Sequence, residues 1–348
     1  MAPAGTKRAT LAQVAELAGV SVMTASYTYN RPERVSDAAR SKVLDAAARL
    51  GYAGPDASAR SLRRGTTLSL GVVLGEHLNY AFDDPGAVSF LAGVAEVCAG
   101  HGYGMTILPI TGSAEDVARI TDAAVDGFIV WTTSDDDPVV AAVQALKRPA
   151  VVHGGPAVPG LGLVSIDNRA AARAVGALAF AGARRPGVVS LPTSRERVSG
   201  ISRATDITSV TFAVTRHRLE GLRDAAEDAG FAWPDVLVAV CSDNDTAEAE
   251  AVAAALLESP EPPDAIAAMS DRQAAGVMRA IRATGRAIPD DVAVTGFDDV
   301  PLASELGLTT VEQSLRDQGA ACARAALGDE VTVHTAPWSI VRRGSTRA

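Results

Sequence analysis

Apolar residues near the start of the chain recur with the period of an α-helix. After Thr10, a good N-cap residue, they fall at spacings of i, i+3, i+4 and i+7: Leu11, Val14, Ala15 and Ala18. Gly19 is expected to end this helix, because glycine readily adopts the left-handed conformation of a tight helix exit. Ser21 caps a second helix that continues to Asn30, and small Ala15 lets the two helices cross closely. Two short helices joined by a glycine turn predict a helix-turn-helix.

A third helix is predicted to start at Ser36 and to stop at Gly51. Its expected inner face consists of Val43, Leu44, Ala47 and Leu50. The second helix is unusual because no residue from Ser21 to Asn30 is charged. Short polar groups and apolar contacts read base edges, whereas cations neutralise phosphates. The pattern therefore predicts a base-reading helix, with phosphates met by Arg34, Arg40 and Lys42. The alternative is a three-helix packing module that binds no DNA.

From Leu68 onward the pattern changes to short apolar runs that alternate with helical segments. Apolar strands are predicted at 68–74, 104–110, 126–132, 149–155, 163–167, 187–191, 236–240, 265–269 and 291–298. The helices expected between them include 90–102, 117–124, 217–229, 246–258 and 271–284. Alternation of this kind predicts parallel βαβ units.

The fold class that follows is α/β, with an N-terminal helix-turn-helix head and two similar doubly wound lobes. The head is assigned to 1–54 and the segment that joins it to the core to 55–67. After Thr310 the chain is predicted to cross back through a helix at 314–326 and to end in a strand at 337–343. Ligands bind such sheets at the carboxyl ends of the strands, so a cleft between the lobes is expected. The core is assigned to 68–348, with lobe one at about 68–167 and 312–330 and lobe two at about 168–311 and 331–348.

Composition is that of a globular protein, with 348 residues of which 47% are hydrophobic and 21% charged. That length suggests two or three domains. Cys98, Cys241 and Cys322 lie far apart without CxxC spacing, which predicts buried reduced thiols rather than disulfides or a zinc site. No apolar run reaches the ~18 residues of a membrane span, and the N-terminal stretch lacks the apolar block of a secretion signal. A cytoplasmic location without membrane contact is expected.

Charge is unevenly spread along the chain. Residues 1–65 hold ten Lys or Arg against five Asp or Glu, a formal charge of +5. The whole chain carries −9, so the remainder carries −14. A basic head on an acidic body is expected when only the head meets a polyanion such as DNA.

Two other classes of protein fit this pattern less well. An enzyme is disfavoured because the chain has no GxSxG, HExxH, P-loop or zinc-ligand spacing, and GHGYG at 100–104 lacks the context of a dinucleotide loop. A transport binding protein would need an export signal and would have no use for a DNA-binding head. We therefore expect no catalytic residues, no metal and no cofactor.

The head resembles a known family. The stretches TLAQVAELAGVSVMTASYTYN (10–30) and RVSDAARSKVLDAAARLGY (34–52) are similar to the DNA-binding head of LacI-type bacterial transcription regulators. The resemblance implies base contacts from Val22, Met23 and Tyr27. The family often has Arg where this chain has Tyr27, and since Arg but not Tyr pairs bidentately with guanine, the preferred half-site should differ there. Contacts to the DNA backbone are implied for Ser21, Thr24, Ser26 and Asn30.

The segment GPDASARSLRRGTT, 54–67, resembles the hinge helix of that family. Pro55 and Asp56 favour a helix start, but the segment is too short to be stable alone. The resemblance implies that it orders when two copies pair in the minor groove. Ala59 would allow the close pairing, and Leu62 would wedge between base steps. The alternative, a flexible basic linker, describes the same segment without DNA.

The resemblance extends into the core, through HRLEGLRDAAEDAG, AIAAMSDRQAAGVMRAIRATGRAIPDDVAVTGFDDV and LTTVEQ. It implies two lobes of the periplasmic-binding-protein type that hold a small effector between them. Arg218 and Asp298 match positions where the family binds effector, as a clamp and as an acceptor for sugar hydroxyls. The alternative for this pair is an interlobe salt bridge. Asp271 follows a strand and is either an effector contact or a helix N-cap.

Three ring-bearing side chains are further candidates for the effector site. Trp131 and His153 end strands of lobe one, and Phe82 lies in the long loop 76–86 after the first strand. A Trp can stack on a sugar face and a His can hydrogen-bond a hydroxyl. The alternative for Trp131 and His153 is an ordinary place in the core.

Two departures from the family leave the effector open. GARRPGV, 182–188, replaces the common GHRRI, and the long stretch 194–217 is expected at the mouth of the cleft. A carbohydrate is expected, with a purine or another small metabolite as alternatives. The complete prediction is a repressor that binds a near-palindromic operator as a homodimer, or as a tetramer, under allosteric control by the effector.

Overall fold

The computed structural model divides into two compact units, Met1–Thr67 and Leu68–Ala348. The predicted hinge residues Ala59 and Leu62 lie outside the described residues. No helix in the described part of the chain is long and apolar enough to cross a membrane. The structure describes residues 9–54, 65–131, 133–203, 205–328 and 333–347.

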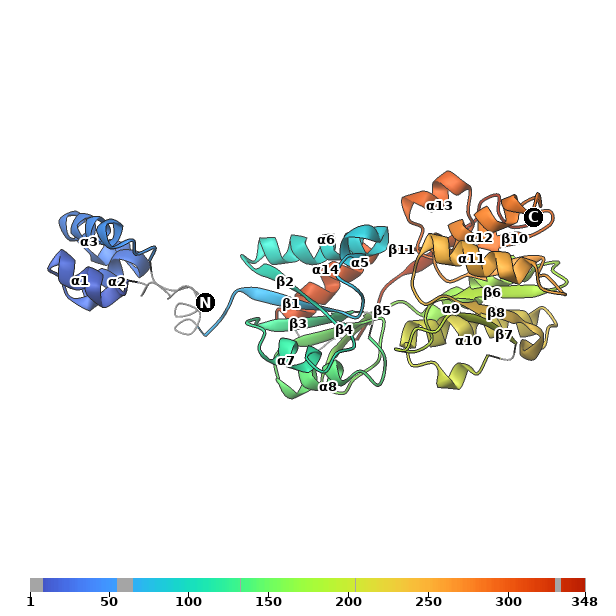
Figure 1. Ribbon diagram of the computed structural model, residues 1–348, viewed down its shortest axis with the longest axis horizontal. Coiled ribbons are helices and arrows are strands. Elements are labelled where there is room, and N and C mark those ends of the chain that lie inside the picture. The colour runs from blue at the N-terminus through green and yellow to red at the C-terminus, as the bar shows by residue number, and fades with distance from the viewer. Residues whose placement is uncertain (1–8, 55–64, 132, 204, 329–332, 348) are drawn as a thin grey trace, which may run out of the picture. The chain divides into compact units, whose positions relative to one another are not determined.

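In the N-terminal unit, residues 9–54 form a bundle of three α-helices (Figure 1). Thr10 and Gln13 form a capping box, in which each backbone N–H donates to the other residue's side-chain oxygen. Gly19 ends the first helix in the left-handed conformation, at φ 65°, and Ser21 caps the second. The described elements are α1 Leu11–Ala18, α2 Val22–Asn30, a 3₁₀ turn Pro32–Arg34 and α3 Asp37–Leu50.

The inner face of α3 differs from the prediction. Val43, Ala46 and Ala47 are buried in the core that α3 shares with α1 and α2. Leu44 and Leu50, predicted to face inward, are 43% and 38% exposed. Successive helix residues lie about 100° apart around the axis, so a face through Val43 and Ala47 turns Leu44 away from it. Small alanines on the buried face allow the helices to pack closely.

The first lobe is a parallel sheet with the strand order β12-β5-β4-β3-β1-β2. Helices α6 Pro85–Gly100 and α14 Leu315–Ala326 pack on one face, after the short helix α5 Tyr80–Asp83. Helices α7 Asp116–Thr121 and α8 Pro138–Ala145 cover the other face. The strands are β1 Ser69–Leu74, β2 Gly104–Pro109, β3 Gly127–Trp131, β4 Ala150–His153, β5 Gly162–Ser165 and β12 Val333–Thr335.

The second lobe is again a sheet flanked by helices (Figure 1), and its strand order is β10-β9-β6-β8-β7. Helices α9 and α10 share one hydrophobic core with the sheet, and α11 and α12 share the other. The helices are α9 Asn168–Phe180, α10 Ala213–Asp228, α11 Thr246–Leu257, α12 Asp271–Ala283 and α13 Pro301–Leu306. The strands are β6 Pro186–Ser190, β7 Gly200–Arg203, β8 Leu237–Val240, β9 Ala265–Ala268 and β10 Ala293–Thr295.

Two features depart from the predicted layout. Strand β7 pairs antiparallel with β8 at the edge of the second sheet, and α10 begins at Ala213 rather than at 217. The long stretch 194–217 therefore contains a strand and the first turn of a helix. Strand β12 pairs with β5 in the first lobe, although 331–348 was assigned to the second. The chain then returns through β13 Trp338–Val341, which pairs antiparallel with the crossover strand β11 Thr310–Gln313. Strand β12 hydrogen-bonds to β5 through backbone groups, and hydrophobic patterning does not show which strand edge a segment will join.

Candidate functional site

Helix α2 of the head buries one side and exposes the other. Ala25 and Thr28 are buried, whereas Val22 and Met23 are 52% and 64% exposed. Tyr27 lies on the same helix and is half-buried. Exposed apolar groups on the first turn of a helix suit contact with thymine methyls. The structure thus places the three predicted base-contacting residues on one short helix, with its N-terminal apolar pair in solvent.

Polar side chains lie at both ends of α2, and basic residues follow it in the chain. The Ser21 hydroxyl accepts a hydrogen bond from the Thr24 amide at 3.0 Å and lies 2.8 Å from the Thr24 hydroxyl. The Asn30 amide group donates to Ser26 Oγ at 3.2 Å. Hydroxyls and amides of this kind can donate to phosphate oxygens, and cations can neutralise them. The predicted basic neighbours Arg34, Arg40 and Lys42 are all exposed.

A cavity of about 130 Å³ lies in the core unit, between the two lobes. Four of the six predicted effector residues line it: Arg218, Asp298, Trp131 and His153. Trp131 lines the cavity from the first lobe, and Phe90, which is fully buried, stacks on it with ring centroids 4.5 Å apart. The arrangement brings together residues from both lobes, as expected for a ligand site at the carboxyl ends of parallel strands.

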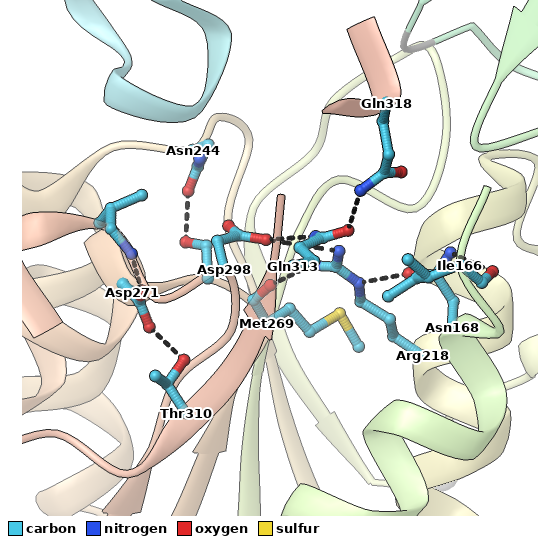
Figure 2. Close-up of polar contacts among 12 residues, drawn as sticks. Ile166, Asn168, Arg218, Asn244, Met269, Asp271, Asp298, Thr310, Gln313 and Gln318 are labelled. Carbon is cyan, nitrogen blue, oxygen red and sulfur yellow. Dashed lines mark hydrogen bonds and ion pairs between the residues drawn. The ribbon is translucent and has the colours of Figure 1, made fainter. Parts of the chain in front are cut away.

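The remaining two predicted effector residues lie elsewhere. Phe82 is absent from the cavity lining and is 66% exposed. The carboxylate of Asp271 accepts hydrogen bonds from the Val300 amide at 2.9 Å and the Thr310 hydroxyl at 2.6 Å (Figure 2). Ser270, rather than Asp271, caps α12. Asp271 therefore joins three segments of the second lobe instead of facing the cavity.

Arg218 is held by protein groups on every side (Figure 2). Its Nε donates to Asn168 Oδ1 at 2.9 Å, and its Nη1 donates to the Met269 carbonyl at 2.5 Å. Its Nη2 lies 3.7 Å from Asp298 Oδ1. The guanidinium plane also covers the ring of Phe297, 3.5 Å from the ring centroid. The Arg218–Asp298 contact joins two segments of the second lobe, so it is an ion pair within that lobe rather than the predicted interlobe salt bridge.

A directed chain of side-chain hydrogen bonds crosses the cavity floor. Gln313 Nε2 donates to Asp298 Oδ1 at 2.7 Å, and Gln318 Nε2 donates to Gln313 Oε1 at 3.0 Å (Figure 2). His153 Nε2 lies 2.9 Å from Gln318 Oε1. Because that oxygen can only accept, the His153 ring must carry its proton on Nε2. The chain links lobe one to lobe two and orients every polar group along it.

Burial controls the charges in this region. It raises the pKa of Asp298 to about 6, although Arg218 and the Gln313 hydrogen bond oppose the change. It likewise raises the pKa of Glu76 to about 7, against the effect of Arg197 at 2.8 Å. Burial lowers the pKa of His153 to about 4, so this ring is neutral at pH 7. The cavity wall thus contains ionised Asp298 and a neutral histidine.

Several cavity residues were not among the predicted effector residues. Asp84 caps α6 through the Ala87 amide and also accepts from Asn244 of the other lobe at 3.2 Å. Asp is a common N-cap residue, so the position of Asp84 before a helical segment indicates a helix start but not a place in the cavity. Gln313 ends the family-like stretch LTTVEQ, but nothing in that stretch indicated a place in the cavity. The others are brought to the cavity by tertiary packing: Glu76, Asn168, Asn244 and Gln318.

The three cysteines are buried free thiols, as predicted. Among the described residues, no group of three or more His, Cys, Asp or Glu side chains is arranged to hold a metal ion.

Family models match both units of the chain. Residues 10–54 match the model described as bacterial regulatory proteins, lacI family, and residues 175–346 match the periplasmic binding protein-like domain. The HTH-type transcriptional regulator Rv3575c of Mycobacterium tuberculosis is 39% identical over 92% of this chain and 90% of its own length. The ribose operon repressor of Halalkalibacterium halodurans is 31% identical over 90% of this chain and 88% of its own length.

Solved structures show the same architecture. A LacI family transcriptional regulator from Corynebacterium glutamicum is 30% identical, with a TM-score of 0.73 over 98% of this chain and 100% of that chain. A complex of the regulator CelR with cellobiose is 27% identical, with a TM-score of 0.67 over 97% of this chain and 100% of that chain.

Proposed function

Because the chain belongs to the LacI family of DNA-binding transcriptional regulators, which are not enzymes, we propose that it is a repressor controlled by a carbohydrate. It binds a near-palindromic operator as a homodimer through α2 of the head. The effector occupies the cavity between the lobes of the core. The observation that carries this proposal is that one chain has both an uncharged α2 with an exposed first turn and a cavity between two lobes that Asp298 and Arg218 line.

Relatives support the finer parts of the proposal. One is named as a repressor of a ribose operon, and another was solved with cellobiose. In the head, base edges are met by Val22, Met23 and Tyr27, and phosphates by the hydroxyls and cations beside them. In the core, Arg218 positions Asp298, whose carboxylate accepts effector hydroxyls. The effector changes the lobe arrangement and thereby the pairing of the two heads on DNA.

Selection of DNA sites from a random library tests the first half of the proposal. The purified protein should enrich a two-fold symmetric site, because a two-fold dimer reads two related half-sites. Enrichment of an asymmetric site, or of none, would contradict it. Sedimentation of the protein with one enriched duplex should give two chains per duplex.

A matched pair of variants tests the role of α2. Met23→Ala should weaken binding to the enriched site by about tenfold, the order expected for loss of one good base contact. Leu17→Ala removes another exposed apolar side chain, 49% exposed, from α1 of the same head. It should leave affinity unchanged. If both variants reduced DNA affinity equally, the assignment of α2 as the base-reading helix would be contradicted.

A further inference from the structure

The cavity offers no free cation to a ligand. Among its described lining residues, Arg218 is the only Arg or Lys, whereas Glu76, Asp84 and Asp298 are acidic. Each of the three guanidinium nitrogens of Arg218 already faces a protein acceptor. Each of the three acids already faces an arginine, so a carboxylate or phosphate placed here would lie beside these acids without a cation released to pair with it. The wall therefore disfavours an anionic ligand.

Two polar atoms of the residues that line the cavity, one from Asp298 and one from Thr133, have no hydrogen-bond partner among the described residues. Asp298 Oδ1 is engaged by Gln313, but no described residue donates a hydrogen bond to Asp298 Oδ2. Thr133 is 3% exposed, and its hydroxyl has no hydrogen-bond partner among the described residues. A buried polar group without a partner costs free energy that a ligand group can recover. An ionised carboxylate accepts and a threonine hydroxyl donates or accepts, which suits ligand hydroxyls.

The rest of the wall is largely apolar and the space is small. Apolar side chains from both lobes line it: Trp131, Ile166, Leu191, Phe212, Val214 and Leu315. The cavity measures about 130 Å³, and an apolar cavity of about 150 Å³ is known to hold one benzene molecule. One six-membered ring fills this space. A second ring would have to extend beyond this space.

Ion pairs between the lobes oppose their separation. Arg272 lies 3.3 Å from Asp84, and Arg197 lies 2.8 Å from Glu76. Arg216 lies 2.6 Å from Asp135 on another side of the cleft. In each pair the arginine belongs to the second lobe and the acid to the first. The size of the cavity is thus maintained by contacts that do not involve the ligand.

We propose that the effector is an uncharged, polyhydroxylated molecule with a single ring, and that the site rejects phosphorylated sugars, other anions and disaccharides. The inference rests on the proposed function, because it takes the cavity as the effector site. Asp298 Oδ2 and the Thr133 hydroxyl bind ligand hydroxyls, and the apolar wall covers the ring. The site differs in this respect from that of the relative solved with cellobiose, a two-ring sugar.

Calorimetric titration of the full chain tests the inference. The panel contains neutral pentoses, hexoses and other single-ring polyols, their phosphate esters, and disaccharides including cellobiose. At least one neutral single-ring compound should bind and change operator affinity, at least 100-fold more tightly than its own phosphate ester. Comparable or tighter binding of a phosphate ester or disaccharide would overturn the inference, as would failure of every single-ring polyol to bind.

Adjacent acids provide a matched pair of variants. Asp298→Asn should weaken binding of the neutral ligand at least tenfold. It should also reduce the ratio of the affinity for the neutral ligand to the affinity for its phosphate ester. Asp299→Asn alters an acid that pairs with Arg343 at 2.7 Å and does not line the cavity, so it should bind like the parent. Operator binding by the ligand-free proteins is measured alongside. If the parent protein shows no sequence-specific DNA binding, the proposed function is contradicted. If it binds DNA specifically but responds to a phosphorylated sugar, another anion or a disaccharide, only this inference is contradicted.

Discussion

At the residue scale, Asp271 shows how burial alters the chemistry of a single group. Burial raises its pKa to about 8, and nearby Asp298 and Asp299 add to the change, while bonds from Thr310 and Val300 oppose it. Folding therefore takes up a proton at this site between about pH 4 and pH 8. Because the folded pKa exceeds the unfolded one, the stabilising contribution is complete at low pH and is lost as pH rises through 8.

The variant Asp271→Asn, which resembles the protonated acid, should reduce that dependence on pH. The free energy of unfolding of the parent should fall more steeply from pH 5 to pH 8 than that of the variant, in urea titrations at each pH. The control is Asp264→Asn, since backbone and Arg184 hydrogen bonds lower the pKa of Asp264. Its difference from the parent should stay constant over the same range. Parallel curves for Asp271→Asn would contradict the assignment.

Tyr27 is the residue expected to set DNA preference, because its ring replaces a cation common in the family. Tyr27→Arg should change the preferred base at one position of each half-site toward guanine, which Arg pairs bidentately. Site selection with parent and variant measures the change directly. Identical enriched sites would show that this residue does not read a base.

At the element scale, the helix pairs that flank the sheets pack with backbone against backbone. A Cβ added at Gly93 of α6 would collide with the Arg316 carbonyl of α14, and one at Gly319 with the Phe90 carbonyl. Gly221 of α10 and Gly276 of α12 meet α9 and α11 in the same way. Glycine costs helix propensity, and its repeated use here allows each pair to approach closely.

Two glycines of α6 separate close packing from helix propensity. Gly93→Ala should destabilise the core by about 1–3 kcal/mol or more, because backbone of α14 must move. Gly100→Ala meets no atom within 4 Å, and it should be neutral or stabilising by up to about 1 kcal/mol. Urea unfolding measures both. A milder effect at Gly93 than at Gly100 would show that the helices do not make this contact in solution.

At the scale of the whole core, the three ion pairs between lobes determine how readily the cleft opens. Arg272 and its partner Asp84 are largely buried, with side chains 20% and 6% exposed. Hydrogen bonds to charged groups contribute about 1.5–3 kcal/mol. Loss of these contacts therefore shifts the population toward a more open arrangement. Effector affinity falls by the same factor as the fraction of molecules in the closed, binding-competent arrangement.

Arg272→Ala should increase the radius of gyration of the ligand-free protein in X-ray scattering and weaken effector binding by about tenfold. Arg316→Ala breaks an ion pair with Glu96 inside the first lobe, at 2.8 Å, and should change neither quantity. Parent-like scattering and affinity for Arg272→Ala would show that this ion pair does not hold the lobes together.

Local patterns were sufficient to predict the helix-turn-helix and the alternation of strands and helices, whereas the choice of Arg218 and Asp298 came from the resemblance to the family. These features depend on caps, hydrophobic periods and short motifs, all of which are encoded within a few residues. The exposed face of α3 and the first residue of α10 were predicted wrongly. The hydrophobic period of a helix does not decide which of two neighbouring apolar residues packs against another element.

The sequence by itself thus determined the elements, the family and the charged head. Only the tertiary structure decided that β12 joins the first lobe, that Asp271 joins segments of the second lobe, and that Gln313 and Gln318 connect His153 to Asp298. These contacts join residues far apart in the chain, and their formation depends on how whole sheets and helices pack. The local sequence around a side chain does not predict which residues it contacts across a cleft.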